Sequence, residues 1–186
     1  MKSTEAKEIR ERMVDMHQFF LDRIDEAIKS GRFIEASWLI YSCLENRFFR
    51  ILQKYKANCR YCTGKCKKNK NELALSTKLS CVKRLCENDV PCISNSFSLA
   101  QLEEIRIWVK KRNHMMHDLL SLDTYENTDE DFKASAIEGQ TILTNLYASC
   151  TRFRHEFYSD KCEFTFPEKA MEDCPCNRNN KESEVD

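Results

Sequence analysis

The stretch SLAQLEEIRIWVKKRNHMMHDL, residues 98–119, predicts one long amphipathic helix that begins at Ser98. At about 100° per residue, its apolar side chains fall on one broad face: Ile105, Trp108, Val109, Met115, Met116 and Leu119. Polar side chains follow a second stripe at spacings of 3 and 4: Arg106, Lys110, Asn113 and His117. Arg112 lies within the apolar face, where a permanently charged guanidinium is costly unless an anion meets it. We expect that anion to be either a carboxylate of the chain itself or a phosphate.

The composition indicates an all-α protein with one domain. The chain of 186 residues contains only 3 Gly and 3 Pro, and the long stretches between them carry helical periodicity. The net charge is zero, so any surface for nucleic acid must be local. The sequence has no apolar run of about 18 residues or more and begins without a signal-peptide pattern. We therefore expect a cytoplasmic protein that makes no membrane contact.

Five long helices are expected along the chain. The first runs from Ser3 or Thr4 to Ser30 and ends at Gly31 in a C-cap role. The others are expected at 32–56, at 71–88, from Ser98 onward, and at 128–158. Residues 89–96 are expected to form a loop, 57–71 a cysteine- and lysine-rich insertion, and 159–186 an irregular cysteine-containing tail. The helical domain would thus occupy residues 3–158.

The second expected helix carries a carboxylate that mirrors the position of Arg112. This helix is apolar almost all round, which predicts a central place in the bundle. One of its stripes sets Glu45 among apolar and aromatic side chains: Ile34, Trp38, Tyr41, Phe48, Phe49 and Leu52. We expect Glu45 and Arg112, or their ligands, to lie near one another. If they form a buried ion pair, removal of either partner would cost about 3–5 kcal/mol.

A group of cysteines in the insertion has the spacing of metal ligands. The chain has 11 Cys, and in a reducing compartment metal ligation and reduced thiols are the usual states. Cys59, Cys62 and Cys66 can face one structural Zn²⁺ from a single tight loop. The fourth ligand is left open among five residues: Cys81, Cys86, Cys92, Cys174 and Cys176. The alternative is a set of reduced thiols on a polar loop.

The same segment is strongly basic. Residues 54–70 contain no acidic residue and seven cations: Lys54, Lys56, Arg60, Lys65, Lys67, Lys68 and Lys70. Tyr55 and Tyr61 are interleaved with them, as in surfaces that bind the backbone of RNA. Arg106 and Lys110, on the polar stripe of the helix from Ser98, are further candidates for RNA contact. The alternative is a solvated loop without a ligand.

Arg112-Asn113, followed by His117, resembles the Arg-x4-His motif of the HEPN superfamily (higher eukaryotes and prokaryotes nucleotide-binding). Ala36-Ser37-Trp38-Leu39-Ile40-Tyr41 and Glu45-Asn46-Arg47 resemble the family's second helix, and the resemblance covers roughly residues 5–158. It implies a HEPN-like helical bundle that cleaves RNA without a metal, usually at a cleft between two copies. A homodimer is therefore expected. Such proteins serve as toxins or antiviral defence effectors, so the resemblance also implies a cognate antitoxin or inhibitor.

The chemistry of these residue types fits RNA cleavage. A histidine with an unperturbed pKa of about 6.5 can take a proton from the ribose 2′-OH or give one to the leaving 5′-oxygen. A planar guanidinium can hold the non-bridging phosphate oxygens as charge builds on them. The candidate catalytic residues are Arg112, His117, Asn113 and Glu45, and any zinc would be structural. The alternatives are a non-catalytic HEPN-like adaptor that binds RNA or protein, and an unrelated helical domain.

Overall fold

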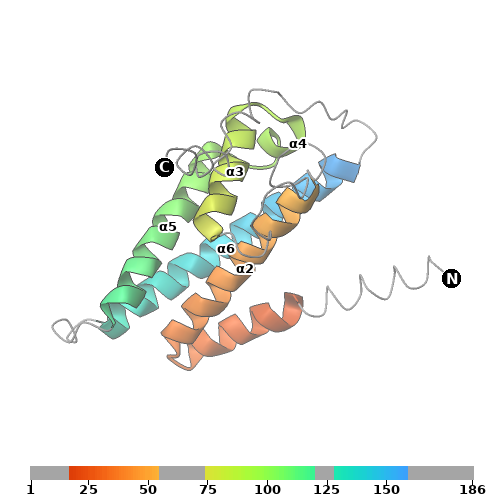
Figure 1. Ribbon diagram of the computed structural model, residues 1–186. Helices are drawn as coiled ribbons and strands as arrows, with labels where there is room; N and C mark the ends of the chain where they lie inside the picture. Colours follow the sequence, from red (N-terminus) through yellow and green to blue (C-terminus); the bar gives the residue numbers. More distant parts are fainter. Residues whose placement is uncertain (1–16, 55–73, 120–127, 159–186) are drawn as a thin grey trace, which may run out of the picture.

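The computed structural model describes residues 17–54, 74–119 and 128–158, in which every regular element is a helix (Figure 1). A first helix is described over residues 17–29. It is followed by α2 (Phe33–Lys54), α3 (Leu75–Glu87), α4 (Pro91–Ser94), α5 (Leu99–Asp118) and α6 (Thr128–Tyr158). The predicted all-α class is confirmed, and the long helices expected at 32–56, at 71–88, from Ser98 onward and at 128–158 correspond to α2, α3, α5 and α6. The first expected helix is described only from residue 17, so its start at Ser3 or Thr4 stays a prediction. The expected insertion at 57–71 and tail at 159–186 lie outside the described residues.

Two predicted helix ends are confirmed in atomic detail. Gly31 adopts a φ of 72° and donates its N–H to the carbonyl of Ile28, while Arg32 donates to Ala27. These two bonds form a Schellman cap, in which glycine relieves the strain of the left-handed conformation. At the start of α5, the Ser98 hydroxyl accepts the backbone N–H of Gln101 at 3.1 Å. This N-cap satisfies one of the backbone donors that the helix leaves free.

The expected loop at 89–96 is partly wrong, because α4 forms a short helical turn inside it. Pro91 occupies the first turn of α4, where proline's fixed φ suits a helix and its missing N–H is not needed. The Val90 carbonyl accepts backbone N–H groups from Ile93 and Ser94, at 2.8 and 2.9 Å. The turn thereby presents Cys92 and Ile93 to the core, where both are fully buried.

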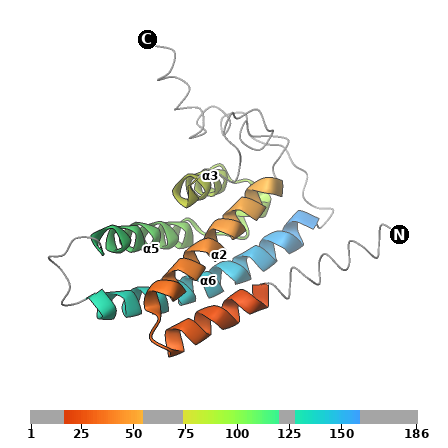
Figure 2. The same ribbon diagram turned by 60° about the horizontal axis from the view of Figure 1, so that its bottom comes forward.

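Helix α2 takes the central position that its apolar sequence predicts. It packs on α6 and α3, while α5 packs on α3 and α6. Figure 2 shows α2 running between α3 and the first helix. Three buried alanines, Ala27, Ala36 and Ala136, let the first helix, α2 and α6 approach closely. Gly139 plays the same part between α5 and α6, because a β-carbon there would lie 2.5 Å from the Trp108 ring.

The expected stripe from Ile34 to Leu52 is only partly a core stripe. Phe48 and Leu52 are buried, but Trp38 is 61% exposed and Ile34 is 42% exposed. The face of α2 that enters the core near its N-terminus consists instead of Ala36 and Ile40, which are fully buried. A helix surrounded on several sides can be apolar all round without every face being covered, so composition overstated the burial of Trp38.

Candidate functional site

Helix α5 carries Arg112 into the interior, as its position on the apolar face predicts. Leu102, Ile105, Val109 and Arg112 recur at spacings of 3 and 4, and Arg112 is the last buried member of this row. The Arg112 side chain is 8% exposed. Burial lowers its pKa from the ordinary range, although an arginine remains charged at any physiological pH. The interior of the bundle therefore holds a permanent positive charge.

The guanidinium of Arg112 is held by an aromatic ring and a neighbouring amide. Its central carbon lies 4.8 Å from the centre of the Tyr41 ring in α2, within the range of a cation–π contact. Its Nη1 donates to Oδ1 of Asn113 at 3.2 Å. Its Nε is buried and has no hydrogen-bond acceptor. No carboxylate among the described residues forms an ion pair with this guanidinium.

The ion pair between Glu45 and Arg112, which the sequence left open as one possibility, is not formed. Glu45 accepts a hydrogen bond from Nζ of Lys78 at 2.8 Å, across the interface between α2 and α3. Lys78 is only 2% exposed, and its ammonium also lies 5.7 Å from the centre of the Phe49 ring. A lysine ammonium is a compact and strongly hydrated charge, so it needs the nearby carboxylate more than a delocalised guanidinium does. That need accounts for the partner that Glu45 takes.

Sequence reasoning missed Lys78, although a signal for it exists. Lys78 interrupts the buried row Leu75, Leu79 and Val82 of α3, just as Arg112 interrupts the row of α5. Lys78 was therefore a second candidate partner for Glu45, because it lies inside the apolar stripe of the third expected helix. Spacing alone cannot decide which of two buried cations faces a given carboxylate, because that depends on how the helices cross.

The remaining motif residues divide between two sides of α5. Asn113 is half-buried and touches Arg112, whereas His117 is exposed. Five positions on a helix separate Arg112 from His117 by about 140° and about 7.5 Å along the axis. The structure thus brings Arg112, Asn113 and Tyr41 together and leaves His117 outside this group.

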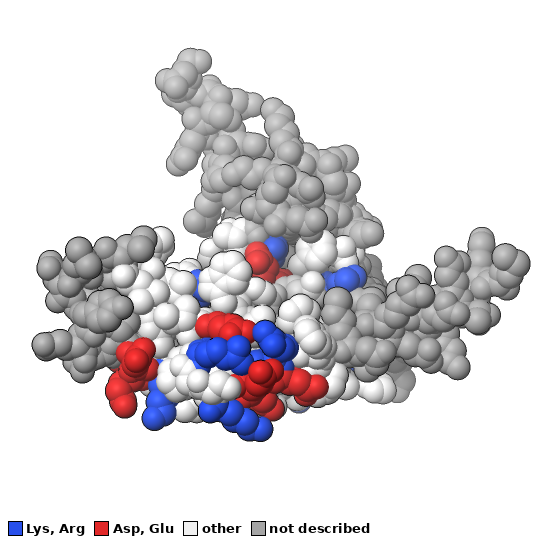
Figure 3. All heavy atoms as spheres, turned by 90° about the horizontal axis from the view of Figure 1, so that it is seen from below, with Lys and Arg blue, Asp and Glu red and all other residues white. Residues whose placement is uncertain are grey.

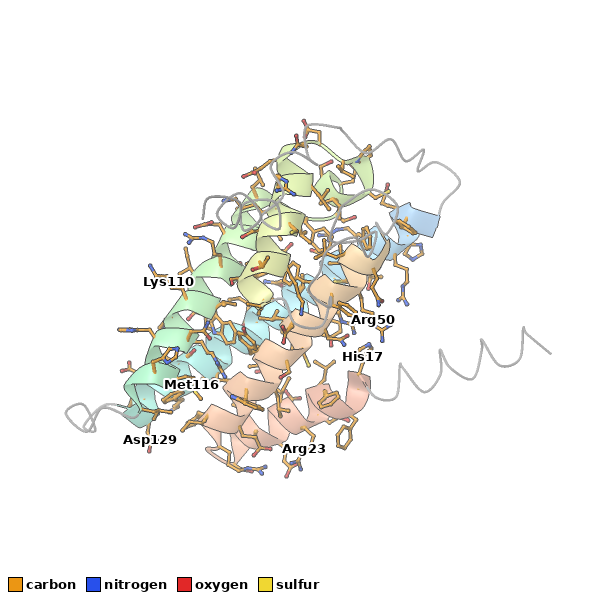
Figure 4. The ribbon with its side chains drawn as sticks, viewed as in Figure 1. His17, Arg23, Arg50, Lys110, Met116 and Asp129 are labelled. Carbon is orange, nitrogen blue, oxygen red and sulfur yellow. The ribbon has the colours of Figure 1, made fainter. Side chains whose placement is uncertain are left out.

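The candidate RNA-binding residues on α5 differ in their availability. Arg106 donates its Nε to both carboxylate oxygens of Glu103 at 3.0 and 2.9 Å. These bonds hold the pKa of Glu103 at about 2, so the pair stays charged and mutually satisfied. Lys110 is exposed and points away from the bundle (Figure 4). Lys54 ends α2, and the other basic candidates lie outside the described residues: Lys56, Arg60, Lys65, Lys67, Lys68 and Lys70.

The candidate zinc ligands Cys59, Cys62 and Cys66 also lie outside the described residues, so the zinc site stays a prediction. In the described ranges no group of His, Cys, Asp or Glu is arranged to hold a metal ion. Of the proposed fourth ligands, Cys81 and Cys86 are buried cysteines of α3, and burial raises the pKa of Cys86. Cys92 is fully buried and disulfide-bonded, a state that differs from the reduced thiols expected.

Comparisons with known proteins give no information on the family or the function of the protein. No protein-family model, no curated protein and no solved structure matches the chain. Within the described ranges, no helix is both long enough and apolar enough to cross a membrane. Function is therefore to be inferred from the chemistry of the residues around Arg112.

Proposed function

We propose that the protein is a HEPN-like, metal-independent endoribonuclease whose phosphate-binding residue is Arg112. The observation that supports this most directly is the charge balance around Arg112. Its guanidinium is buried against Tyr41, its Nε lacks an acceptor, and Glu45 is engaged by Lys78. A buried cation without a carboxylate is a poor structural device but a ready anion site. A phosphate diester of RNA supplies the missing charge.

In the proposed reaction, His117 moves protons and Arg112 stabilises the phosphate. One imidazole takes the proton of the ribose 2′-OH, the 2′-oxygen attacks phosphorus, and the 5′-oxygen leaves with a proton. The products are a 2′,3′-cyclic phosphate and a free 5′-hydroxyl. Arg112 neutralises the charge that builds on the non-bridging oxygens, and Asn113 fixes the guanidinium through its amide oxygen. Glu45 has a supporting part, because it neutralises Lys78 one helical turn from Tyr41.

The separation of Arg112 from His117 has a consequence for assembly. Two side chains about 140° apart on one helix cannot both close on one phosphate without help from another surface. We propose that a second copy of the chain completes the site, so that a homodimer is the active form. The same proposal includes RNA as the substrate, a cognate inhibitor protein as a partner, and a role as a toxin or defence effector.

Cleavage of mixed RNA in EDTA by the purified full chain tests the proposal. The wild type is expected to produce fragments that end in 2′,3′-cyclic phosphate, detected by the resistance of their 3′ ends to ligation until the phosphate is opened and removed. EDTA leaves the rate unchanged because the chemistry uses no metal. His117→Ala is expected to reduce the rate strongly, since the proton-transfer group typically contributes about 10²–10⁴-fold.

His155→Ala provides the matched control, because His155 is also an exposed histidine of a long helix but lies on α6. It is expected to keep the wild-type rate. Full cleavage by His117→Ala, or the absence of any cleavage by the wild type, would reject the catalytic proposal. Equal losses in the two histidine variants would indicate a general effect on folding.

A non-catalytic adaptor is the second candidate, and the exposed aromatic surface of α2 favours it. Trp38 is 61% exposed and Ile34, one turn earlier, is 42% exposed. Exposed tryptophan is enriched where proteins bind one another. In that case Trp38→Ala abolishes binding to a protein partner, and the wild type leaves RNA intact. The nuclease proposal predicts the reverse pattern, with cleavage that depends on Arg112 and His117.

A further inference from the structure

A second group of cations lies where the first helix, α2 and α6 meet. Arg47 of α2 stacks on Tyr147 of α6, with its guanidinium carbon 4.1 Å from the ring centre. His17 of the first helix meets the same ring edge-on, at 6.2 Å between ring centres. Arg50 and Arg154 face His17 closely enough to affect its charge. Figure 4 shows His17 and Arg50 next to one another on the side of the bundle away from Lys110.

The charges in this group are not balanced. None of Arg47, Arg50 and Arg154 forms an ion pair with a carboxylate of the described residues, and Nε of Arg47 is buried without an acceptor. Burial and the three guanidiniums lower the pKa of His17 to about 4, so its imidazole is neutral at physiological pH. The group therefore carries three positive charges that the described part of the chain leaves uncompensated.

The arginines at the turn into α2, by contrast, are paired with carboxylates. At the turn into α2, Arg23 bonds to Glu35 and Arg32 bonds to both Glu26 and Glu35. Figure 3 shows Lys and Arg interleaved with Asp and Glu on the face seen from below, where this turn lies. Mixed charge is the ordinary state of a solvated helical surface. An exposed group of one sign points to a ligand of the opposite sign.

The group is separate from the proposed catalytic site. Arg50 follows Tyr41 by nine positions, which places it about 180° round α2 and about 13 Å along its axis. Tyr41 faces α5, where it meets Arg112, whereas Arg47 faces α6, where it meets Tyr147. A single phosphate cannot bridge the two places, but an extended strand can contact both.

We propose that Arg47, Arg50 and Arg154 form a docking surface for the phosphate backbone of single-stranded RNA. Arg50 and Arg154 are exposed and can reach successive phosphates, while the stacked Arg47 is held in place by Tyr147. Guanidinium groups suit phosphates because their planar fork can donate two hydrogen bonds to one anion. The choice of RNA as the polyanion rests on the proposed function. The charge and geometry of the surface do not.

The salt dependence of binding tests this surface without requiring cleavage. The probe is a fluorescein-labelled 2′-O-methyl oligouridylate, which lacks the attacking hydroxyl, and binding to the full chain is followed by fluorescence anisotropy. A plot of log affinity against log salt concentration has a negative slope, and each phosphate contact that is lost on a single strand makes this slope shallower by about 0.7. The double variant Arg50→Ala/Arg154→Ala is therefore expected to make the slope shallower by about 1.4 and to weaken binding at low salt.

Lys29→Ala/Lys133→Ala is the matched control, because it removes the same charge from two exposed positions elsewhere. It is expected to keep the wild-type slope, as is the charge-preserving variant Arg50→Lys/Arg154→Lys. Equal slopes in the two alanine variants, or no binding of the probe by the wild type, would overturn the proposal. So would a loss of polyglutamate binding in Arg50→Ala/Arg154→Ala with unchanged binding of the oligouridylate, since that result assigns the surface to an acidic protein.

The result is distinguishable from failure of the nuclease proposal. His117→Ala is expected to bind the uncleavable probe normally even though it does not cut RNA. If binding depends on Arg50 and Arg154 while no variant cleaves RNA, the docking surface stands and the catalytic proposal fails. If cleavage depends on His117 while the slopes do not change, the catalytic proposal stands and the docking surface fails.

Discussion

Lys78 and Arg112 are two buried cations in one small bundle, and the protein accommodates them differently. Lys78 is 2% exposed and donates to a carboxylate of α2, whereas Arg112 is 8% exposed and stacks on a tyrosine of the same helix. An ammonium concentrates its charge, so burial without an anion would remove its proton. A guanidinium spreads its charge and tolerates an aromatic face. The first arrangement is internally complete, whereas the second lacks an anion among the described residues.

We propose that this difference separates a structural charge from a functional one. Glu45 satisfies Lys78, so this pair gives α2 and α3 a fixed register without needing a ligand. Arg112 has an amide and a ring but no anion among the described residues. The two cations should therefore respond in opposite ways when their surroundings are changed. Stability should depend on the Lys78 pair, and RNA cleavage should depend on Arg112.

Glu45→Ala is expected to have the largest effect on stability. It leaves the Lys78 ammonium buried without a partner, which typically costs about 3–5 kcal/mol of unfolding free energy. Urea unfolding followed by circular dichroism measures the loss. The double variant Glu45→Leu/Lys78→Met should recover most of it, because apolar side chains of similar volume remove the buried ammonium together with its partner. A loss below about 1 kcal/mol for Glu45→Ala would mean that the pair behaves like a solvated surface pair.

Arg112→Met is expected to separate stability from activity. No ion pair is lost and a desolvated charge is removed, so the unfolding free energy should change by less than about 1 kcal/mol. The RNA cleavage rate should fall by about 10²–10³-fold, the usual consequence of removing one group that stabilises the charge of the transition state. Urea unfolding and the EDTA cleavage assay on the same preparation test both statements. A destabilised variant with normal cleavage would reverse the roles assigned to the two cations.

Much of the fold follows from local signals in the sequence. Gly31, Ser98 and the period of the apolar residues mark helix ends and faces, because capping and amphipathicity act within a few residues. The exposure of Trp38 did not follow from them, and neither did α4. Both depend on which neighbouring helix covers a given face, and that is a property of packing rather than of the helix itself.

The candidate site could be predicted only in part for a related reason. The position of Arg112 inside an apolar stripe correctly indicated burial, since helical period fixes the direction of a side chain. The partner of Glu45 was left open between an internal pair with Arg112 and another arrangement, and the sequence did not point to Lys78, because only the helix crossing decides which buried cation meets this carboxylate. The cations around Tyr147 come from α2 and α6, and the neighbouring His17 comes from the first helix, so no short sequence motif predicts this group.

A double-mutant cycle on Tyr41 and Arg112 sharpens the comparison further. The variants Tyr41→Leu, Arg112→Met and their combination give the coupling energy of the stacked pair from urea unfolding. We expect about 1–2 kcal/mol, because a cation over a ring is worth more when both are desolvated. The matching cycle on Phe49 and Lys78 should give less than about 0.5 kcal/mol, since this ammonium lies 5.7 Å from the ring centre and is satisfied by Glu45. Equal coupling in both cycles would remove the distinction between a stacked and a paired cation.

His17 shows a third way of accommodating positive charge, which is to remain neutral. Burial, and then Arg47, Arg50 and Arg154, lower its pKa from 6.5 to about 4. Between these values the unfolded chain binds more protons than the folded one, so stability falls as the pH drops through this window. The imidazole is partly solvated, so we expect His17 to contribute roughly 1 kcal/mol to the loss rather than the full shift.

Comparing urea unfolding at about pH 7 and about pH 4.5 measures this contribution in the wild type and in His17→Gln. The variant has no imidazole to protonate, so it should lose less stability on acidification. His155→Gln removes an exposed histidine of α6 and should behave as the wild type does. A phosphate bound among the three arginines would raise the pKa of His17, so the oligouridylate should narrow the difference between wild type and His17→Gln. Equal losses of unfolding free energy in all three proteins would show that the arginines around Tyr147 do not affect the pKa of His17. That result would remove one of the observations that support the cation group.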